Sequence, residues 1–455
     1  MSSETVAAQE APRLPGLPLL GNAMQLRLNP LQTLVKAHRD LGSVFQMSAL
    51  HQRFLVLAGI EANQFLMRDR GEHLLVDSMF KAFAQELGTK SFLVAMDGSE
   101  HRHQRKELKS GFSAQTMEPH MPRLLRMVDE MIDRWRPGQD IRVLDQMQKL
   151  VANQLGLVLT QHPHAAEIDA IRTYGGTIFR VHMVKSHPQI CLKLPGFLRA
   201  KRRLRQRAER LIDWHKKNPP GPRPNDLVDV LLNAKTSAGQ PLPDDAVLAG
   251  VVDAHLVGID TVASTCSFAL ALLAQHRSAA STIRAEAQHQ LANGSMDGNF
   301  LHCLPKTHAA CMETMRMYPV APVSPRLVGK PFEFGGYRFE TGTKVLIANA
   351  VTHLLHEFFP DPHHFDITRW QGSSRVAGAY SPYTLGEHVC LGAAMAELQM
   401  TMILARIMQR VTFAVCIQKI KVHTTPVPNP GFRMRLRVKR IVQTPLSRQT
   451  PRVSV

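Results

Sequence analysis

The sequence predicts a mainly α-helical fold with small β-sheets, on the basis of three observations. Helical periodicity of apolar side chains dominates residues 60–320, between joints rich in proline and glycine. Residues 244–276 form an apolar run with an acidic first turn, which as one uninterrupted helix would be about 50 Å long. After Pro319 the pattern changes to short strands and turns, as in PFEFGGYRFETGTKVLIA.

The N-terminal region predicts one helix followed by a pair of strands. Residues 12–22, PRLPGLPLLGN, are a proline-rich lead-in that neither a helix nor a strand would tolerate. Residues 29–42 predict a helix that ends at its terminal glycine. Residues 43–59 then predict two strands around a polar turn.

The chain is strongly basic, with a formal net charge of +18 over 455 residues. Such a charge favours nucleic acid, an anionic membrane or an acidic protein as a partner. The densest basic cluster, residues 199–211, carries Leu204, Ala208 and Leu211 at helical spacing, with Ile212 directly after it. We therefore interpret it as an amphipathic helix with a solvated basic face, and we expect no nucleic-acid partner because no aromatic residues interleave with the charges.

Targeting signals are weak in this sequence. The N-terminus lacks the basic start and apolar middle of a secretory signal. No run of eighteen or more uncharged apolar residues predicts a membrane-spanning helix. We expect a cytoplasmic protein with at most peripheral membrane contact, through ICLKLPGF (190–197) beside the basic cluster.

Cys390 differs from the other five cysteines because it lies in a glycine-flanked loop, SPYTLGEHVCLGAA, directly before an amphipathic run. Free backbone N–H groups and the helix dipole at such a position favour a thiolate and lower the pKa of a thiol. Gly386 and Gly392 leave the backbone bare for a large flat group, and His388 can donate to a nearby anion. Spacing alone leaves a nucleophile, a metal ligand and an inert buried cysteine open.

The segment YTLGEHVCLG resembles the haem-binding signature of the cytochromes P-450, in which an aromatic residue, a glycine and a basic residue precede Cys-x-Gly. The resemblance implies that Cys390 is the axial thiolate ligand of the iron of haem b. Tyr383, Gly386, His388 and Gly392 would surround the cofactor. Tyrosine replaces the usual phenylalanine, which is expected to alter the redox potential, and histidine replaces arginine but still suits a haem propionate.

The motif ETMR resembles a second element of this family. Glu313 and Arg316 are three residues apart and share one helix face. By resemblance they join Arg369 and hold the loop that carries the cysteine. Taken alone, the motif is equally compatible with an ordinary surface ion pair.

The motif VGIDT, residues 257–261, resembles the element that lies over the haem iron in this family. Gly258 would leave room for dioxygen, and Thr261 would bond back to a carbonyl one turn earlier and open the helix. Asp260 and Thr261 would relay protons as catalytic residues. Val257 stands where alanine or glycine is usual, so it is expected to narrow the pocket or touch the substrate.

The segment DGSEHRHQRKELKSGFS resembles the helix that binds the haem propionates. His101 and Arg105 lie four residues apart on one face, and Arg326 matches a further propionate-binding arginine. A second metal site is not expected in the later histidine-rich segment, because HLLHE is not the HExxH zinc pattern. The histidines concerned are His353, His356, His363 and His364.

The resemblance covers nearly the whole chain and implies the cytochrome P-450 fold. This is a triangular, prism-like single domain, expected over residues 12–440, with haem between the long central helix and the helix after the cysteine loop. Residues 1–11 are expected to be a flexible N-terminus and residues 441–455 a C-terminal tail.

The activity implied by the resemblance is a monooxygenase that activates dioxygen with external electrons and hydroxylates or epoxidises a lipophilic small molecule. Terpenoids, steroids, fatty acids and polyketides fit the mainly apolar pocket. Its expected residues include Ala254, Val257, Val320 and Val323, with further contributions from 76–96, from around Phe179 and from TTPVP near the C-terminus.

Electrons would come from a ferredoxin or flavodoxin with its reductase, attracted by Arg102, Lys106 and Lys109. Two alternatives stay open. One is a peroxide-driven or electron-independent haem-thiolate enzyme, and the other is a non-catalytic haem carrier or sensor.

Overall fold

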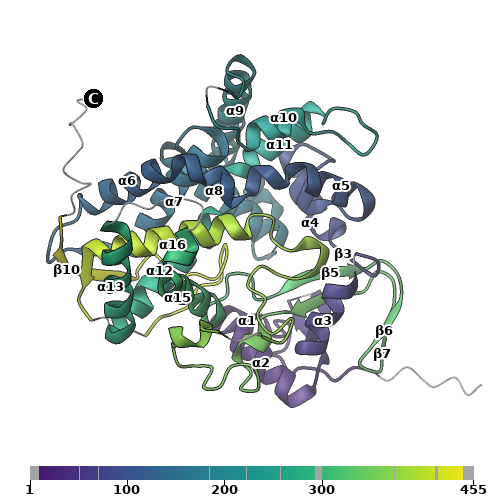
Figure 1. Ribbon diagram of the computed structural model, residues 1–455. Coiled ribbons are helices and arrows are strands. Elements are labelled where there is room, and N and C mark those ends of the chain that lie inside the picture. The colour runs from purple at the N-terminus through teal and green to yellow at the C-terminus, as the bar shows by residue number, and fades with distance from the viewer. Residues whose placement is uncertain are drawn as a thin grey trace, which may run out of the picture.

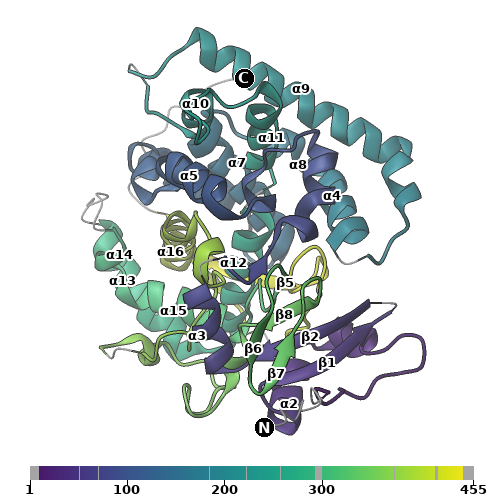
Figure 2. The same cartoon turned by 90° about the vertical axis from the view of Figure 1, so that its right-hand side faces the viewer.

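The computed structural model describes residues 10–50, 52–69, 71–183, 185–221, 223–256, 258–292, 300–372, 375–415 and 419–443. Most helices gather in one part of the molecule, and the largest sheet lies beside α1 and α2 in another (Figures 1 and 2). The helices are α1 (Ala23–Leu28), α2 (Pro30–Leu41), α3 (Ile60–Asp69), α4 (Asp77–Leu87), α5 (Gly98–Leu108), α6 (Met121–Ile132), α7 (Val143–Thr160), α8 (Ile168–Ile178), α9 (Pro195–Lys217), α10 (Leu227–Asn233), α11 (Asp244–Ala254), α12 (Ile259–Gln275), α13 (Arg277–Ala292), α14 (Phe300–Cys303), α15 (Pro305–Met317) and α16 (Ala393–Arg410).

Three small sheets accompany the helices. The largest has the order β1-β2-β8-β5-β3, the second β4-β10-β9, and the third is the hairpin β6-β7. Only β2 and β8 pair in parallel among the named strands, with Leu55 opposite Val345. The strands are β1 (Val44–Ala49), β2 (Gln52–Ala58), β3 (Leu74–Leu75), β4 (Asp140–Arg142), β5 (Ser324–Val328), β6 (Phe332–Phe334), β7 (Tyr337–Phe339), β8 (Lys344–Ala348), β9 (Val411–Phe413) and β10 (Arg435–Ile441).

The predicted N-terminal helix and strand pair are confirmed as α2, β1 and β2. Gly42 caps α2 with a φ of 90°, a left-handed conformation that suits glycine. The basic segment is also helical: within α9, Leu204, Ala208 and Leu211 are buried while most of the basic side chains are exposed.

The prediction of one uninterrupted helix over 244–276 is wrong. α11 ends at Ala254, and α12 begins at Ile259. The backbone tightens first, because the N–H groups of His255 and Leu256 donate to carbonyls three residues earlier. Gly258 then adopts a φ of +77°, and a Cβ there would contact Leu155 of α7 at 3.0 Å.

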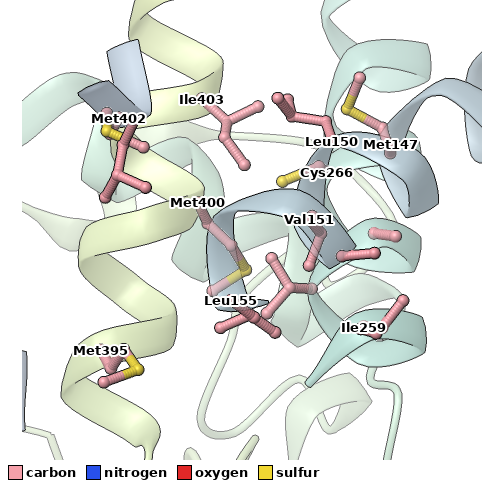
Figure 3. Close-up of a cluster of buried hydrophobic side chains, with 14 of the residues drawn as sticks. Met147, Leu150, Val151, Leu155, Ile259, Cys266, Met395, Met400, Met402 and Ile403 are labelled. Atoms are coloured by element: carbon pink, nitrogen blue, oxygen red, sulfur yellow. The ribbon is translucent and has the colours of Figure 1, made fainter. Parts of the chain in front are cut away.

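The segment Asp244–Gln275, taken as one run, is apolar and long enough to cross a membrane by composition. The fold supplies another reason for that composition, since 76% of its most apolar window is buried inside the protein. Side chains of α7, α12 and α16 meet there in the main hydrophobic core (Figure 3). Met395, Met400 and Leu155 connect this core to the cavity described below.

Candidate functional site

A mostly apolar cavity of about 490 Å³ lies among α5, α11, α12, β5 and the loop before α16. It brings together side chains that are up to about three hundred residues apart in the chain. The residues predicted from the sequence that line it are His101, Arg105, Gly258, Thr261, Val320, Val323, Arg326, Tyr383, His388, Cys390 and Gly392.

Four other predicted site residues are not placed on this wall. Ala254 is buried in the core, and from the end of α11 Gly250 and Asp253 line the cavity instead. Asp260 and Gly386 do not line the cavity either. Val257 lies outside the described residues. The expected wall segments at Phe179 and at residues 424–428 also make no part of it, whereas residues 76–94 do through the side chains of Val76, Phe80, Ser91, Phe92, Leu93 and Val94.

The cysteine loop is fixed by its backbone. Gly386 has a φ of +74°, and a Cβ at this position would overlap the carbonyl oxygen of Leu66 in α3. This close packing by itself requires a glycine at position 386. The Cys390 N–H donates to the Tyr383 carbonyl over 3.0 Å and closes the loop.

The thiol of Cys390 opens onto the cavity, three residues before α16 begins. Desolvation raises its pKa and outweighs the lowering effects of the Gly392 N–H and the Arg105 guanidinium. The N–H at the helix terminus thus acts in the expected direction, but the net shift of the pKa is upward. A bound metal ion would supply the charge that deprotonates a coordinating thiol.

Two stacked histidines and two carboxylates line one end of the site. The rings of His101 and His388 stack with their centroids 4.2 Å apart, and the ring of His388 lies 2.9 Å from the Asp97 carboxylate through Nε2. Glu387 binds Arg102 at 3.0 Å and lies 3.6 Å from Nδ1 of His101. The sequence analysis missed Asp97 and Glu387, because no local pattern indicates that residues of α5 and of its cap contact the cysteine loop.

Several donors of these basic residues are unpaired in the part of the chain that the structure describes. Arg326 is buried, its Nε has no partner, and its single hydrogen bond is to the Pro325 carbonyl. Burial lowers its pKa to about 10, against the opposing effect of Asp97 and Asp69. Nδ1 of His101 also makes no hydrogen bond. Buried donors left unpaired on a cavity wall indicate an anionic ligand.

The break between α11 and α12 presents a hydroxyl to the same cavity. Oγ1 of Thr261 donates to the Gly258 carbonyl over 3.2 Å, as the sequence predicts. Asp260 points elsewhere, since its carboxylate accepts from Gln148 at 2.5 Å. Burial raises the pKa of Asp260, while Gln148 and the nearby Arg172 act in the opposite direction.

Glu313 and Arg316 form a fully buried cluster rather than a surface ion pair. Arg316 donates to both carboxylate oxygens of Glu313 at 2.8 and 2.9 Å. Nε of Arg369 lies 3.3 Å from the same carboxylate, as the family resemblance implies. Trp370, which the sequence analysis missed, donates its indole N–H to Glu313 at 3.0 Å.

The histidine-rich segment forms no metal site among the residues that the structure covers. His353 is buried and its Nε2 accepts from the Ser381 N–H at 2.9 Å. The side chains of His356, His363 and His364 are exposed.

A thiol that opens onto a mostly apolar cavity, next to a buried arginine with an unpaired donor, would suit a haem bound through sulfur and through its two carboxylates. The family model of cytochrome P450 matches residues 12–434, so the chain belongs to the cytochrome P450 family, whose members are haem-thiolate oxidoreductases. The family implies a haem-thiolate cofactor, and the donors at Arg326 and His101 fit its propionates.

The chain is similar to several proteins of this family. It shares 29% identity over 413 residues with cyclooctat-9-en-7-ol 5-monooxygenase of Streptomyces melanosporofaciens, covering 87% of each chain. It shares 25% identity with pentalenene oxygenase of Streptomyces avermitilis, over 98% of this chain and 100% of the relative. The solved structure of retinoic acid-bound cyanobacterial CYP120A1 matches with a TM-score of 0.82 and 22% identity, over 96% of this chain and 100% of that chain, which confirms the fold.

Proposed function

We propose that this protein is a monooxygenase that uses haem b, dioxygen and electrons from a separate protein to hydroxylate or epoxidise a lipophilic small molecule. One observation carries the proposal: Cys390 and Thr261 line the same mostly apolar cavity. An axial ligand and a proton-bearing hydroxyl are thereby held in one water-poor space. The single domain is proposed to extend over residues 12–440 and to be cytoplasmic.

Each residue has a task in this proposal. The haem, when bound, supplies the activation of dioxygen. Cys390 holds the iron through its sulfur, and Arg105, Arg326 and the histidine pair bind the propionates. Thr261 holds a proton at Oγ1, and the Gly258 carbonyl fixes the direction of that hydroxyl.

Asp260 has a different task from the one expected. Its carboxylate is bonded to Gln148, which in turn accepts from Arg172, a partly exposed residue. The chain of bonds runs away from the cavity. We propose that Asp260 takes a proton from solvent after a change of rotamer releases it from Gln148, and passes that proton toward Thr261.

The substrate class follows from the wall and from the relatives. The wall is mostly apolar, and Val320 and Val323 contribute to it. Two relatives carry names of terpenoid oxygenases, and a third, from Mycobacterium bovis, is named sterol 14alpha-demethylase, with 24% identity. We therefore propose a terpenoid or steroid ahead of a fatty acid or polyketide.

The electron donor is proposed to be a ferredoxin or flavodoxin with its reductase, docking near α5. Lys106 and Lys109 are exposed there, whereas Arg102 is bound to Glu387. Reversing both lysine charges is expected to slow reduction about tenfold at low salt, and the difference should shrink as ionic strength rises. Stopped-flow reduction measures this. Lys216→Glu on α9 is the control, and equal slowing by it contradicts the docking site.

The haem-thiolate assignment is tested first by spectroscopy. Reduced wild-type protein under carbon monoxide is expected to show a strongly red-shifted Soret band, which Cys390→Ser abolishes and Cys303→Ser retains. Incorporation of labelled oxygen from dioxygen, driven by reduced nicotinamide and a redox-partner pair, then tests turnover. Turnover with peroxide alone would support the electron-independent alternative, and spectral binding without any turnover would support the carrier or sensor.

A further inference from the structure

Asp253 is an acidic residue on an otherwise apolar part of the cavity wall. It lies in the last turn of α11, and its surface faces the cavity. Gly250 and Ala246 lie one and two turns earlier on the same face, and both also line the cavity. A Cβ at Gly250 would contact the side chain of Leu231.

The carboxyl group of Asp253 has no hydrogen bond or ion pair to any residue in the described part of the chain. Asp260, seven residues later, is bonded to Gln148, so the two acids of this region are in opposite situations. Tyr174 on α8 is bonded elsewhere, since its hydroxyl donates to the Glu86 carbonyl at 3.3 Å. The carboxyl group is therefore available to a ligand group that enters the cavity.

The electrostatic surroundings give no compensation to this group. Burial raises the pKa of Asp253 to about 7, and no cation opposes it. Part of the Asp253 side chain is accessible, and that part faces the cavity rather than the outer surface. Desolvation is therefore the main effect on its pKa. A residue kept in this state at the site of a reaction indicates a partner that arrives with the ligand.

We propose that Asp253 positions the substrate by a hydrogen bond to a hydroxyl group on an otherwise lipophilic molecule. This inference rests on the proposed function and narrows its substrate class to alcohols. A carboxyl group pairs with a hydroxyl in either protonation state, because it can donate or accept. An ammonium group requires the ionised form and the desolvation of two charges against an apolar wall.

In this proposal the substrate hydroxyl that Asp253 binds is distinct from the carbon atom that is oxidised. Thr261 follows the helix break, whereas Asp253 precedes it, so the anchored hydroxyl and the oxidised carbon are different parts of the substrate. The substrate is therefore the product of an earlier hydroxylation, hydration or ester-cleaving step.

Binding to the haem-loaded protein tests the inference with matched pairs of terpenoid and steroid alcohols and the hydrocarbons that lack the hydroxyl group. The hydrocarbon keeps the skeleton but can neither donate nor accept. Wild-type protein is expected to bind the best alcohol about tenfold more tightly than its hydrocarbon, which corresponds to one hydrogen bond. Asp253→Asn should keep most of this preference, and Asp253→Leu should reduce it to within about twofold. Asp245→Leu, an exposed acid at the start of α11, is the control.

Spectral shifts and ligand-induced changes in Tm give two readouts that do not need turnover. Equal affinity for alcohols and the matched hydrocarbons, no binding throughout the panel, or an unchanged preference in Asp253→Leu would each overturn the inference. Tighter binding of a trimethylammonium analogue than of the alcohol, lost in Asp253→Asn, would overturn the inference and show that Asp253 recognises a cation. The carbon monoxide spectrum separates the two levels: without a haem-thiolate band in wild-type protein the proposed function fails, and with that band present only the role of Asp253 fails.

Discussion

Two buried arginines ten residues apart, Arg316 and Arg326, are in contrasting environments. Arg316 makes five hydrogen bonds, two to Glu313 and three to the carbonyl oxygens of His353, Pro362 and His364. The guanidinium group has five N–H donors, so all of them are used. Arg326 makes one hydrogen bond, and its buried Nε makes none.

The difference indicates that Arg316 stabilises the fold, whereas Arg326 has donors left over for a ligand. The cluster around Glu313 ties α15 to the segment before the cysteine loop, through Trp370, Arg369 and the N–H of Asp366. Its charges are balanced within the chain. The charge of Arg326 is balanced only in part, by Asp97 and Asp69, which is why burial lowers its pKa. The two propionates of a haem would supply the remaining partners.

The largest expected effect is that of Glu313→Gln, which tests the balanced side of this comparison. The substitution keeps the shape of the side chain but leaves Arg316 as an uncompensated buried cation. Unfolding free energy is expected to fall by about 3–5 kcal/mol in the haem-free and haem-loaded protein alike. Denaturant titration measures this.

Glu209→Gln is the matched control, because Glu209 also pairs with an arginine, Arg205, but on the exposed face of α9. Its loss is expected to change stability by less than about 1 kcal/mol. Equal effects at both sites would show that burial of the Glu313 cluster has no energetic role.

Arg326→Met tests the unbalanced side. Removing a buried cation with few partners should leave the haem-free protein as stable as before, or slightly more stable. Haem affinity is expected to fall about 10- to 100-fold, since a charge-assisted hydrogen bond contributes about 1.5–3 kcal/mol. Haem transfer to apomyoglobin measures the affinity. A variant that loses stability without haem, yet retains haem normally, would place Arg326 with Arg316 as a structural residue.

Local spacing predicted the parts of the site that a single helix or loop contains. Glu313 and Arg316 share a helix face, as do His101 and Arg105, and the structure pairs or clusters them accordingly. The interaction of Trp370 with Glu313 spans 57 residues, and that of His388 with Asp97 spans 291. Contacts over such distances follow from the packed fold, which periodicity does not determine.

The region of α11 and α12 gives a second example of what the sequence pattern did not determine. Its acidic residues were visible within an apolar run, but the sequence pattern did not show which of them face the cavity. The break at Gly258 changes the helical phase, so that Asp253 and Thr261 line the cavity while Asp260 does not. The net shift of the Cys390 pKa was misjudged for a related reason, because desolvation of the thiol depends on all the elements that surround it.

The last expected effect concerns pH and again uses the balanced cluster. His353 is fully buried beside Arg316, and burial, followed by the charge of Arg316, lowers its pKa to about 3. In the unfolded chain its pKa is about 6.5, so below that pH the unfolded state binds the proton first. Stability contributed by neutral His353 is therefore complete above about pH 6.5 and declines toward pH 3, by up to about 1.4 kcal/mol per pH unit.

His353→Gln should flatten this acid dependence, because a glutamine oxygen can still accept from the Ser381 N–H but binds no proton. The exposed His356 provides the control, and His356→Gln is expected to leave the slope unchanged. Unfolding free energies measured by urea titration between pH 4 and 7 decide the matter. An unchanged slope in His353→Gln would mean that His353 gains a proton in the folded protein without cost. The groups around Arg316 would then have to move enough to accommodate a second positive charge.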